Sequence, residues 1–214
     1  MSTEHCGGPG LEGYPSDCSL TEALRRRAQE RNKPLDRSPE WQQALIPARQ
    51  VKLLLLDVDG VLTNGCLTYT SDGDEAKSFH TQDGLGIKLL QESGVEVGII
   101  TARTSKVVAR RAEELKLAHV VQGKFDKLSA YEEILKTTGL RPLQTAYMGD
   151  DWVDLPLLNR VGLAAAPANA RVEIIQRVHY ISQREGGQGA VRELCDLILE
   201  AQGNYGQMFG RFDR

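Results

Sequence analysis

Long apolar runs are absent from this sequence. Runs such as Leu53–Leu56 are far shorter than the roughly 20 apolar residues that a membrane-spanning helix needs. The first residues also lack an apolar segment of the kind that a secretory signal contains. These absences argue against a membrane protein and against a secreted one, and we expect a cytoplasmic protein.

Paired cysteines and an excess of positive charge are absent too. The four cysteines are scattered and none forms a CxxC pair, so the sequence predicts neither a zinc site nor a disulfide framework. The formal net charge is −3, which gives no basic surface for nucleic acid. A short basic run from Arg25 to Arg27 is interpreted as a solvated helix face, with a nucleic-acid contact as the alternative.

The composition that remains is that of a packed globular protein with one main domain. The chain has 214 residues, of which 41% are hydrophobic and 26% charged. Residues 1–50 show little apolar periodicity and are predicted to form an N-terminal extension of unknown role, in which Ser19 and Ser38 would each begin a helix. Residues 51–202 are predicted to form the main domain, and residues 203–214 a C-terminal tail.

From Val51 onward, short apolar runs alternate with amphipathic segments. This alternation is typical of an α/β fold with a doubly wound parallel sheet, in which helices cover both faces. Between the first strand and the first helix, the turn dipeptide Asp72-Gly73 predicts a small β-hairpin insertion, too short to be a separate domain. Strands are predicted at residues 51–58, 95–101, 118–121, 145–148 and 161–165.

Polar side chains follow the predicted strands, at the edge of the sheet where ligands bind in such folds. The first strand ends in Asp57-Val58-Asp59, and strand alternation places the two carboxylates on the same side. The later strand ends add a hydroxyl, two cations and three further acids. These residues are Thr101, Arg103, Lys127, Asp150, Asp151 and Asp154.

This set of groups suits phosphoryl transfer from a substrate bound to magnesium. Mg²⁺ prefers oxygen ligands and accepts a few carboxylates. A cation is needed because the transferred group gathers negative charge that carboxylates alone would repel. Each piece is weak by itself, since an aspartate at a strand end is usually a cap or turn residue. Together and in this order, the residues predict a magnesium-dependent phosphatase.

The segment DVDGVLT, from Asp57 to Thr63, resembles the first motif of the haloacid dehalogenase superfamily. Thr101, Lys127 and Gly149-Asp150-Asp151 match its second, third and fourth motifs in sequence order. The resemblance covers Val51 to the C-terminus and implies the Rossmann-like fold of that superfamily.

The resemblance implies a role for each matched residue. Asp57 would be the nucleophile that forms an aspartyl-phosphate, and Asp59 the general acid and base. Thr101 and Lys127 would hold phosphate oxygens.

A magnesium site is implied by the same motifs. The side chains of Asp57 and Asp150 and the backbone carbonyl of Asp59 would bind the ion. Asp151 and Asp154 would support these ligands from behind, or supply a ligand themselves if the register differs.

Longer segments narrow the resemblance to the 3-deoxy-D-manno-octulosonate 8-phosphate phosphatases. These segments are VKLLLLDVDGVLTNG, TQDGLGIKLL, QGKFDKLSAY, AYMGDDWVDLPLL and GGQGAVRELCDLIL. That family lacks a large cap domain and forms a homotetramer through its hairpins, with neighbouring subunits closing each active site. The resemblance therefore implies a homotetramer that hydrolyses this eight-carbon sugar-acid phosphate in lipopolysaccharide biosynthesis.

Four residues are implied to contact the substrate. Arg103 stands where this family has arginine, whereas phosphatases of nine-carbon sugar acids often have glutamate. Arg111 would meet the substrate carboxylate, or is an exposed helix residue. Asp83 would line the pocket, or caps a helix. Gly187 lies in a late glycine loop whose amides would face an anion, or which is an ordinary turn.

Alternatives to this function remain. The protein would otherwise be a phosphatase of a nine-carbon sugar-acid phosphate, or a non-catalytic regulatory copy of the fold. Ala102 and Gln188 depart from the family, which commonly has a glycine and a basic residue at these positions. A signalling receiver domain is disfavoured, because its phosphate-accepting aspartate lies on a later strand than Asp57 does here.

Overall fold

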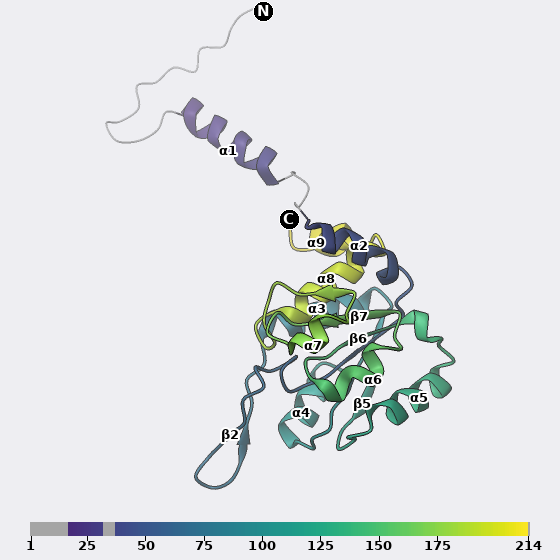
Figure 1. Ribbon diagram of the computed structural model, residues 1–214. Helices are drawn as coiled ribbons and strands as arrows, with labels where there is room; N and C mark the ends of the chain where they lie inside the picture. Colours follow the sequence, from purple (N-terminus) through teal and green to yellow (C-terminus); the bar gives the residue numbers. More distant parts are fainter. Residues whose placement is uncertain (1–16, 32–36, 214) are drawn as a thin grey trace, which may run out of the picture. The chain divides into compact units, whose positions relative to one another are not determined.

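The computed structural model describes residues 17–31 and 37–213 (Figure 1). The chain divides into two compact units, Met1–Arg37 and Ser38–Arg214. The described part of the first unit is helix α1 (Asp17–Arg31). No helix in the described ranges is both long enough and apolar enough to cross a membrane.

A six-stranded parallel sheet forms the centre of the second unit. The strand order is β5-β4-β1-β6-β7-β8, and every neighbouring pair runs parallel. This confirms the predicted α/β fold. The strands are β1 (Leu53–Leu56), β4 (Glu96–Ile100), β5 (His119–Val121), β6 (Thr145–Met148), β7 (Leu163–Ala166) and β8 (Tyr180–Ile181).

Helices cover both faces of the sheet, and the strand residues alternate between two apolar clusters. Leu54 and Leu56 of β1 pack in the larger cluster, whereas Leu53 and Leu55 pack in the other. The first cluster lies under α2 (Pro39–Ala48), α3 (Thr81–Glu92), α4 (Lys106–Glu114) and α8 (Ala190–Ala201). The second lies under α5 (Lys127–Thr138), α6 (Leu155–Leu158) and α7 (Val172–Ile175). The other helical segments are η1 (Pro142–Gln144), η2 (Trp152–Asp154) and α9 (Tyr205–Gly210).

Helix α2 belongs to the second unit, although the sequence analysis places its residues in the N-terminal extension. Ser38 caps it as predicted, because Ser38 Oγ accepts a hydrogen bond from Trp41 N at 3.2 Å. Trp41, Ala44 and Ala48 are buried in the first apolar cluster. The compact unit therefore begins before Val51.

Two short strands, β2 (Thr68–Tyr69) and β3 (Glu75–Ala76), pair antiparallel between β1 and α3. They form an arm that projects from the sheet (Figure 1). Gly73 adopts a φ of +84° in the turn that joins them, a conformation that glycine reaches without strain. Leu67 and Tyr69 are exposed, so the arm buries little apolar surface of its own.

Candidate active site

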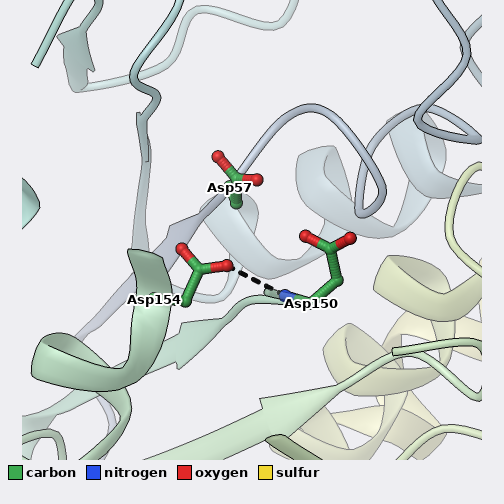
Figure 2. Close-up of side chains that lie close together, drawn as sticks. All are labelled: Asp57, Asp150 and Asp154. Carbon is green, nitrogen blue, oxygen red and sulfur yellow. Dashed lines mark hydrogen bonds between the residues drawn. The ribbon is translucent and has the colours of Figure 1, made fainter. Parts of the chain in front are cut away.

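Three carboxyl groups converge beyond the ends of β1 and β6 (Figure 2). Asp57 follows β1, Asp150 follows β6, and Asp154 ends η2. Oxygens of all three lie within 4.8 Å of one another. They meet because β1 and β6 are neighbouring parallel strands, whose carboxyl ends lie at the same edge of the sheet.

Lys127, the first residue of α5, lies between two of these acids. Its Nζ donates hydrogen bonds to Asp57 Oδ1 at 2.7 Å and to Asp154 Oδ1 at 2.6 Å. Burial lowers the pKa of Lys127, but the charges of Asp57 and Asp154 outweigh it, and the net pKa is raised. The ammonium group therefore stays charged although only 1% of the side chain is exposed.

Asp154 supports the site with both of its oxygens. Oδ1 accepts hydrogen bonds from Lys127 and from the Tyr147 hydroxyl, the latter at 2.6 Å. Oδ2 accepts from the backbone N–H groups of Asp150 at 2.9 Å and Asp151 at 3.2 Å. These four hydrogen bonds use the oxygens that a metal ion would need. Asp154 therefore suits a supporting position better than a metal-ligand position.

Asp57 and Asp150, the two other acids of the cluster, are suited to bind a cation. Burial, followed by repulsion from Asp154, raises the pKa of Asp57 to about 6. Burial and the charges of Asp57 and Asp154 raise the pKa of Asp150 to about 7. Oxygen ligands whose ionised forms repel one another in this way suit a hard divalent ion, which would relieve the repulsion.

The backbone of Gly60, the residue after Asp59, packs against the side chain of Asp150. Gly60 has a φ of +95°, and a Cβ at this position would lie 2.0 Å from Asp150 Oδ2. Only glycine allows such an approach. An ion bound by Asp150 would therefore lie close to the loop that contains the Asp59 carbonyl.

The late glycine loop packs against this same loop instead of presenting its amides to a ligand. The N–H of Gly187 donates to Val61 O at 2.9 Å, and the N–H of Gly186 donates to Asn169 Oδ1 at 2.9 Å. A Cβ at Gly186 would lie 1.7 Å from Gly60 O. The amides of Gly186 and Gly187 are therefore used within the fold, which favours the alternative that this loop is an ordinary turn.

Thr101 directly follows β4, the other neighbour of β1 in the sheet. Its side chain is buried, and its Oγ1 accepts a hydrogen bond from Arg103 N at 3.4 Å. The hydroxyl therefore stands at the same edge of the sheet as Asp57, where the sequence analysis expects it.

Asp59 faces the β2–β3 arm. Lys77 Nζ donates a hydrogen bond to Asp59 Oδ1, and Arg103 Nε lies 3.7 Å from Asp59 Oδ2. Arg103 also contacts Glu75 Oε1 at 3.2 Å and the Tyr69 hydroxyl at 3.3 Å. Arg103 thus lies beside Asp59. Lys77 and Glu75 were not found from the sequence, because they belong to no motif.

Three further expected residues have structural contacts. Asp83 is 2% exposed, and its Oδ1 accepts a hydrogen bond from Arg192 N at 2.7 Å, so it caps α8 across the domain. Arg111 lies over the Phe79 ring at 5.7 Å and 3.3 Å from Glu114. Asp151 Oδ1 accepts from the N–H of Trp152 at 2.7 Å. Asp83 thus accepts an N–H of α8 and does not cap α3, the helix that it opens.

Comparison with known proteins shows the family of this chain. Residues 117–194 match the model of the haloacid dehalogenase-like hydrolases. The 3-deoxy-D-manno-octulosonate 8-phosphate phosphatase of Yersinia pestis is 45% identical over 155 residues, which cover 72% of this chain and 83% of that protein. The chain belongs to this family of haloacid dehalogenase-like phosphatases. The Escherichia coli K12 member of the family is 40% identical over 81% of this chain and 92% of its own length.

Solved structures of this phosphatase family share the fold. A probable phosphatase from Pseudomonas syringae superposes with a TM-score of 0.80 at 44% identity, over 81% of this chain and 98% of that one. The Moraxella catarrhalis 3-deoxy-D-manno-octulosonate 8-phosphate phosphatase, solved with magnesium, phosphate and KDO, gives a TM-score of 0.78 at 40% identity, over 80% and 98%. As a member of the family, this chain is a phosphoric monoester hydrolase.

Proposed function

We propose that the protein hydrolyses 3-deoxy-D-manno-octulosonate 8-phosphate to the free sugar acid and phosphate, with Mg²⁺ and through an aspartyl-phosphate on Asp57. The observation that supports this most is the meeting of Asp57, Asp150 and Lys127 at one point, with Lys127 Nζ 2.7 Å from Asp57. The names and bound ligands of the relatives support the choice of sugar and metal.

The magnesium ion would be held by Asp57, Asp150 and the Asp59 carbonyl. When bound, it supplies positive charge to the phosphate oxygens. Asp154 would fix the position of Asp150 through the backbone hydrogen bond at 2.9 Å, and it would fix Lys127 at the same time.

One carboxylate oxygen of Asp57 would attack phosphorus, and the other would bind the magnesium ion. Lys127 and Thr101 would bind phosphate oxygens, and Lys127 would offset the charge that develops there. Asp59 would protonate the departing sugar oxygen, then take a proton from the water that hydrolyses the aspartyl-phosphate.

The substrate contacts and the assembly are also proposals. Arg103, beside Asp59, would contact the sugar acid. Arg111 would meet its carboxylate as a planar fork. A homotetramer would cover the exposed Leu67 and Tyr69 of the β2–β3 arm and place a neighbouring subunit over the site.

The test is an assay of released phosphate from the eight-carbon and nine-carbon sugar-acid phosphates, with Mg²⁺ or with EDTA. We expect a higher kcat/KM for the eight-carbon substrate and loss of activity in EDTA. A preference for the nine-carbon substrate would refute the choice of sugar. Undiminished magnesium-dependent activity in Asp57→Asn would refute the aspartyl-phosphate.

A further inference from the structure

Lys77 is a buried cation beside Asp59. Its Nζ donates a hydrogen bond to Asp59 Oδ1 and lies 3.3 Å from Glu75 Oε1. Only 1% of its side chain is exposed. A lysine removed from water to this extent needs carboxylate partners, and these two acids supply them.

Lys77 lies in a cluster of four ionisable side chains. Two cations, Lys77 and Arg103, face two acids, Asp59 and Glu75, with Arg103 contacting both acids. A hydrogen bond with Ser105, together with Arg103 and Lys77, lowers the pKa of Glu75, so this carboxylate remains ionised and holds Lys77 in place. Because Lys77 directly follows β3, the base of the arm brings this cation to the loop after β1.

A carboxyl group that transfers a proton must present one oxygen to the leaving group in a fixed direction. The carboxyl group of an exposed aspartate turns easily about its last side-chain bond. In this structure Lys77 donates a hydrogen bond to Oδ1 of Asp59, whereas Arg103 Nε lies 3.7 Å from Oδ2, too far for a hydrogen bond, so Oδ2 is the oxygen for proton transfer. Orientation of this kind is worth a large factor in rate.

We propose that Lys77 is a positioning residue that fixes the carboxyl group of Asp59 for proton transfer to the sugar oxygen. The proposal rests on the proposed function, because it requires Asp59 to be the acid. In the first step the bond from Asp57 to phosphorus forms, the bond from phosphorus to the sugar oxygen breaks, and the proton of Asp59 passes to that oxygen. In the second step water attacks phosphorus, returns a proton to Asp59 and releases the Asp57 carboxylate.

Dependence on the leaving group distinguishes this role from a structural one. An alkoxide leaves only with a proton, whereas the nitrophenolate of p-nitrophenyl phosphate leaves without one. The measurement is therefore kcat/KM on both substrates, since this ratio reports the steps up to the departure of the leaving group.

Lys77→Met keeps the length of the side chain and removes the cation. We expect kcat/KM for the sugar phosphate to fall about 10- to 100-fold. With p-nitrophenyl phosphate we expect a fall of about threefold or less, because no proton transfer is required. Asp59→Asn should show the same pattern with a larger loss on the sugar phosphate, and Lys136→Met, at an exposed position of α5, should change neither value.

The outcomes separate the two proposals. If Lys77→Met lowers kcat/KM equally on both substrates, while Asp59→Asn lowers it mainly on the sugar phosphate, the proposed role of Lys77 is refuted and the proposed function stands. An Asp59→Asn variant that does not discriminate would overturn the proposed role of Asp59 itself. Thermal unfolding of each variant shows whether a loss of activity comes from a misfolded chain. A Lys77→Met variant that loses activity mainly on the sugar phosphate and keeps the Tm of the parent supports the proposal that Lys77 positions Asp59.

Discussion

Asp150 is a residue whose charge opposes folding in the absence of metal. Its folded-state pKa is raised to about 7, from an ordinary value of 3.8, by burial and then by Asp57 and Asp154. A raised pKa means that the folded chain binds the proton more tightly than the unfolded chain. The corresponding stability is fully present below pH 3.8 and is lost as the pH rises through about 7. At pH 8 the metal-free fold is therefore less stable by the cost of ionising this group.

Asp150→Asn should remove that cost. We expect the free energy of unfolding of the metal-free variant at pH 8 to exceed that of the parent by about 1 kcal/mol, a typical gain for a stabilising substitution. The gain should shrink at pH 5, where Asp150 of the parent is largely protonated. Thermal unfolding in EDTA at both pH values measures it.

The control for this prediction is Asp72→Asn in the exposed turn of the arm, which should have little effect at either pH. A gain for Asp150→Asn that is equal at pH 5 and pH 8 would contradict the role of its charge. Mg²⁺ should raise the Tm of the parent more than that of the variant, because the variant loses a charged ligand.

The residues that we propose as catalytic could be selected from the sequence because they lie in short local motifs at or near the ends of apolar strands. Tyr147 could not be predicted as part of the site, because it lies within the apolar strand β6, where the pattern indicates a core residue. Its hydroxyl contacts Asp154, 7 positions away. Lys77 could not either, since its partner Asp59 lies 18 positions away and no local pattern encodes the pairing.

Among the secondary-structure elements, α3 and α8 are joined by a contact that spans much of the chain. Asp83, in the first turn of α3, accepts a hydrogen bond from the N–H of Arg192 in the first turn of α8, 109 positions away. A carboxylate at a helix N-terminus satisfies an N–H group that the helix itself leaves unpaired. Since the glycine loop leads directly into α8, this contact also fixes where that loop meets the residues after Gly60.

Asp83→Ala should therefore destabilise the fold. We expect a loss of about 1–2 kcal/mol in the free energy of unfolding, as for other lost N-caps. Asp83→Asn, which retains an oxygen acceptor in the same place, should lose less. Urea denaturation of the two variants measures the difference, and an equal loss for both would show that the negative charge, and not the hydrogen bond, is what matters.

The strands that could be predicted from the sequence are those with a clear apolar run. Strands β1, β4, β5, β6 and β7 were expected from their apolar runs. Strand β8 has two residues and gives no periodic signal. Helix α2 is predicted from the sequence but its burial is not, because its apolar residues include the exposed Ile46 and so do not define a single apolar face.

At the scale of the whole molecule, every residue placed in the active site lies in the unit Ser38–Arg214. A chain that begins at Ser38 should therefore fold and retain the phosphatase activity of the full chain within about twofold. A chain that begins at Val51 also loses Trp41 and the rest of α2, which pack against α8. Removing one large core side chain costs about 3–5 kcal/mol, so this shorter chain should be much less stable.

Thermal unfolding and phosphate release from the two truncated chains test this prediction. Equal stability of both would show that α2 contributes little to the core. Loss of activity in the chain that begins at Ser38 would assign a catalytic or assembly role to the residues before it.

Asp154 joins Lys127 and the backbone of Asp150 through a single carboxylate. In the proposed site, Asp154 therefore fixes the distance between the phosphate-binding Lys127 and the magnesium-binding Asp150, and this distance does not depend on which sugar is bound. Selectivity for different sugars can then diverge through changes in the β2–β3 arm and its neighbours, while the reaction chemistry stays constant.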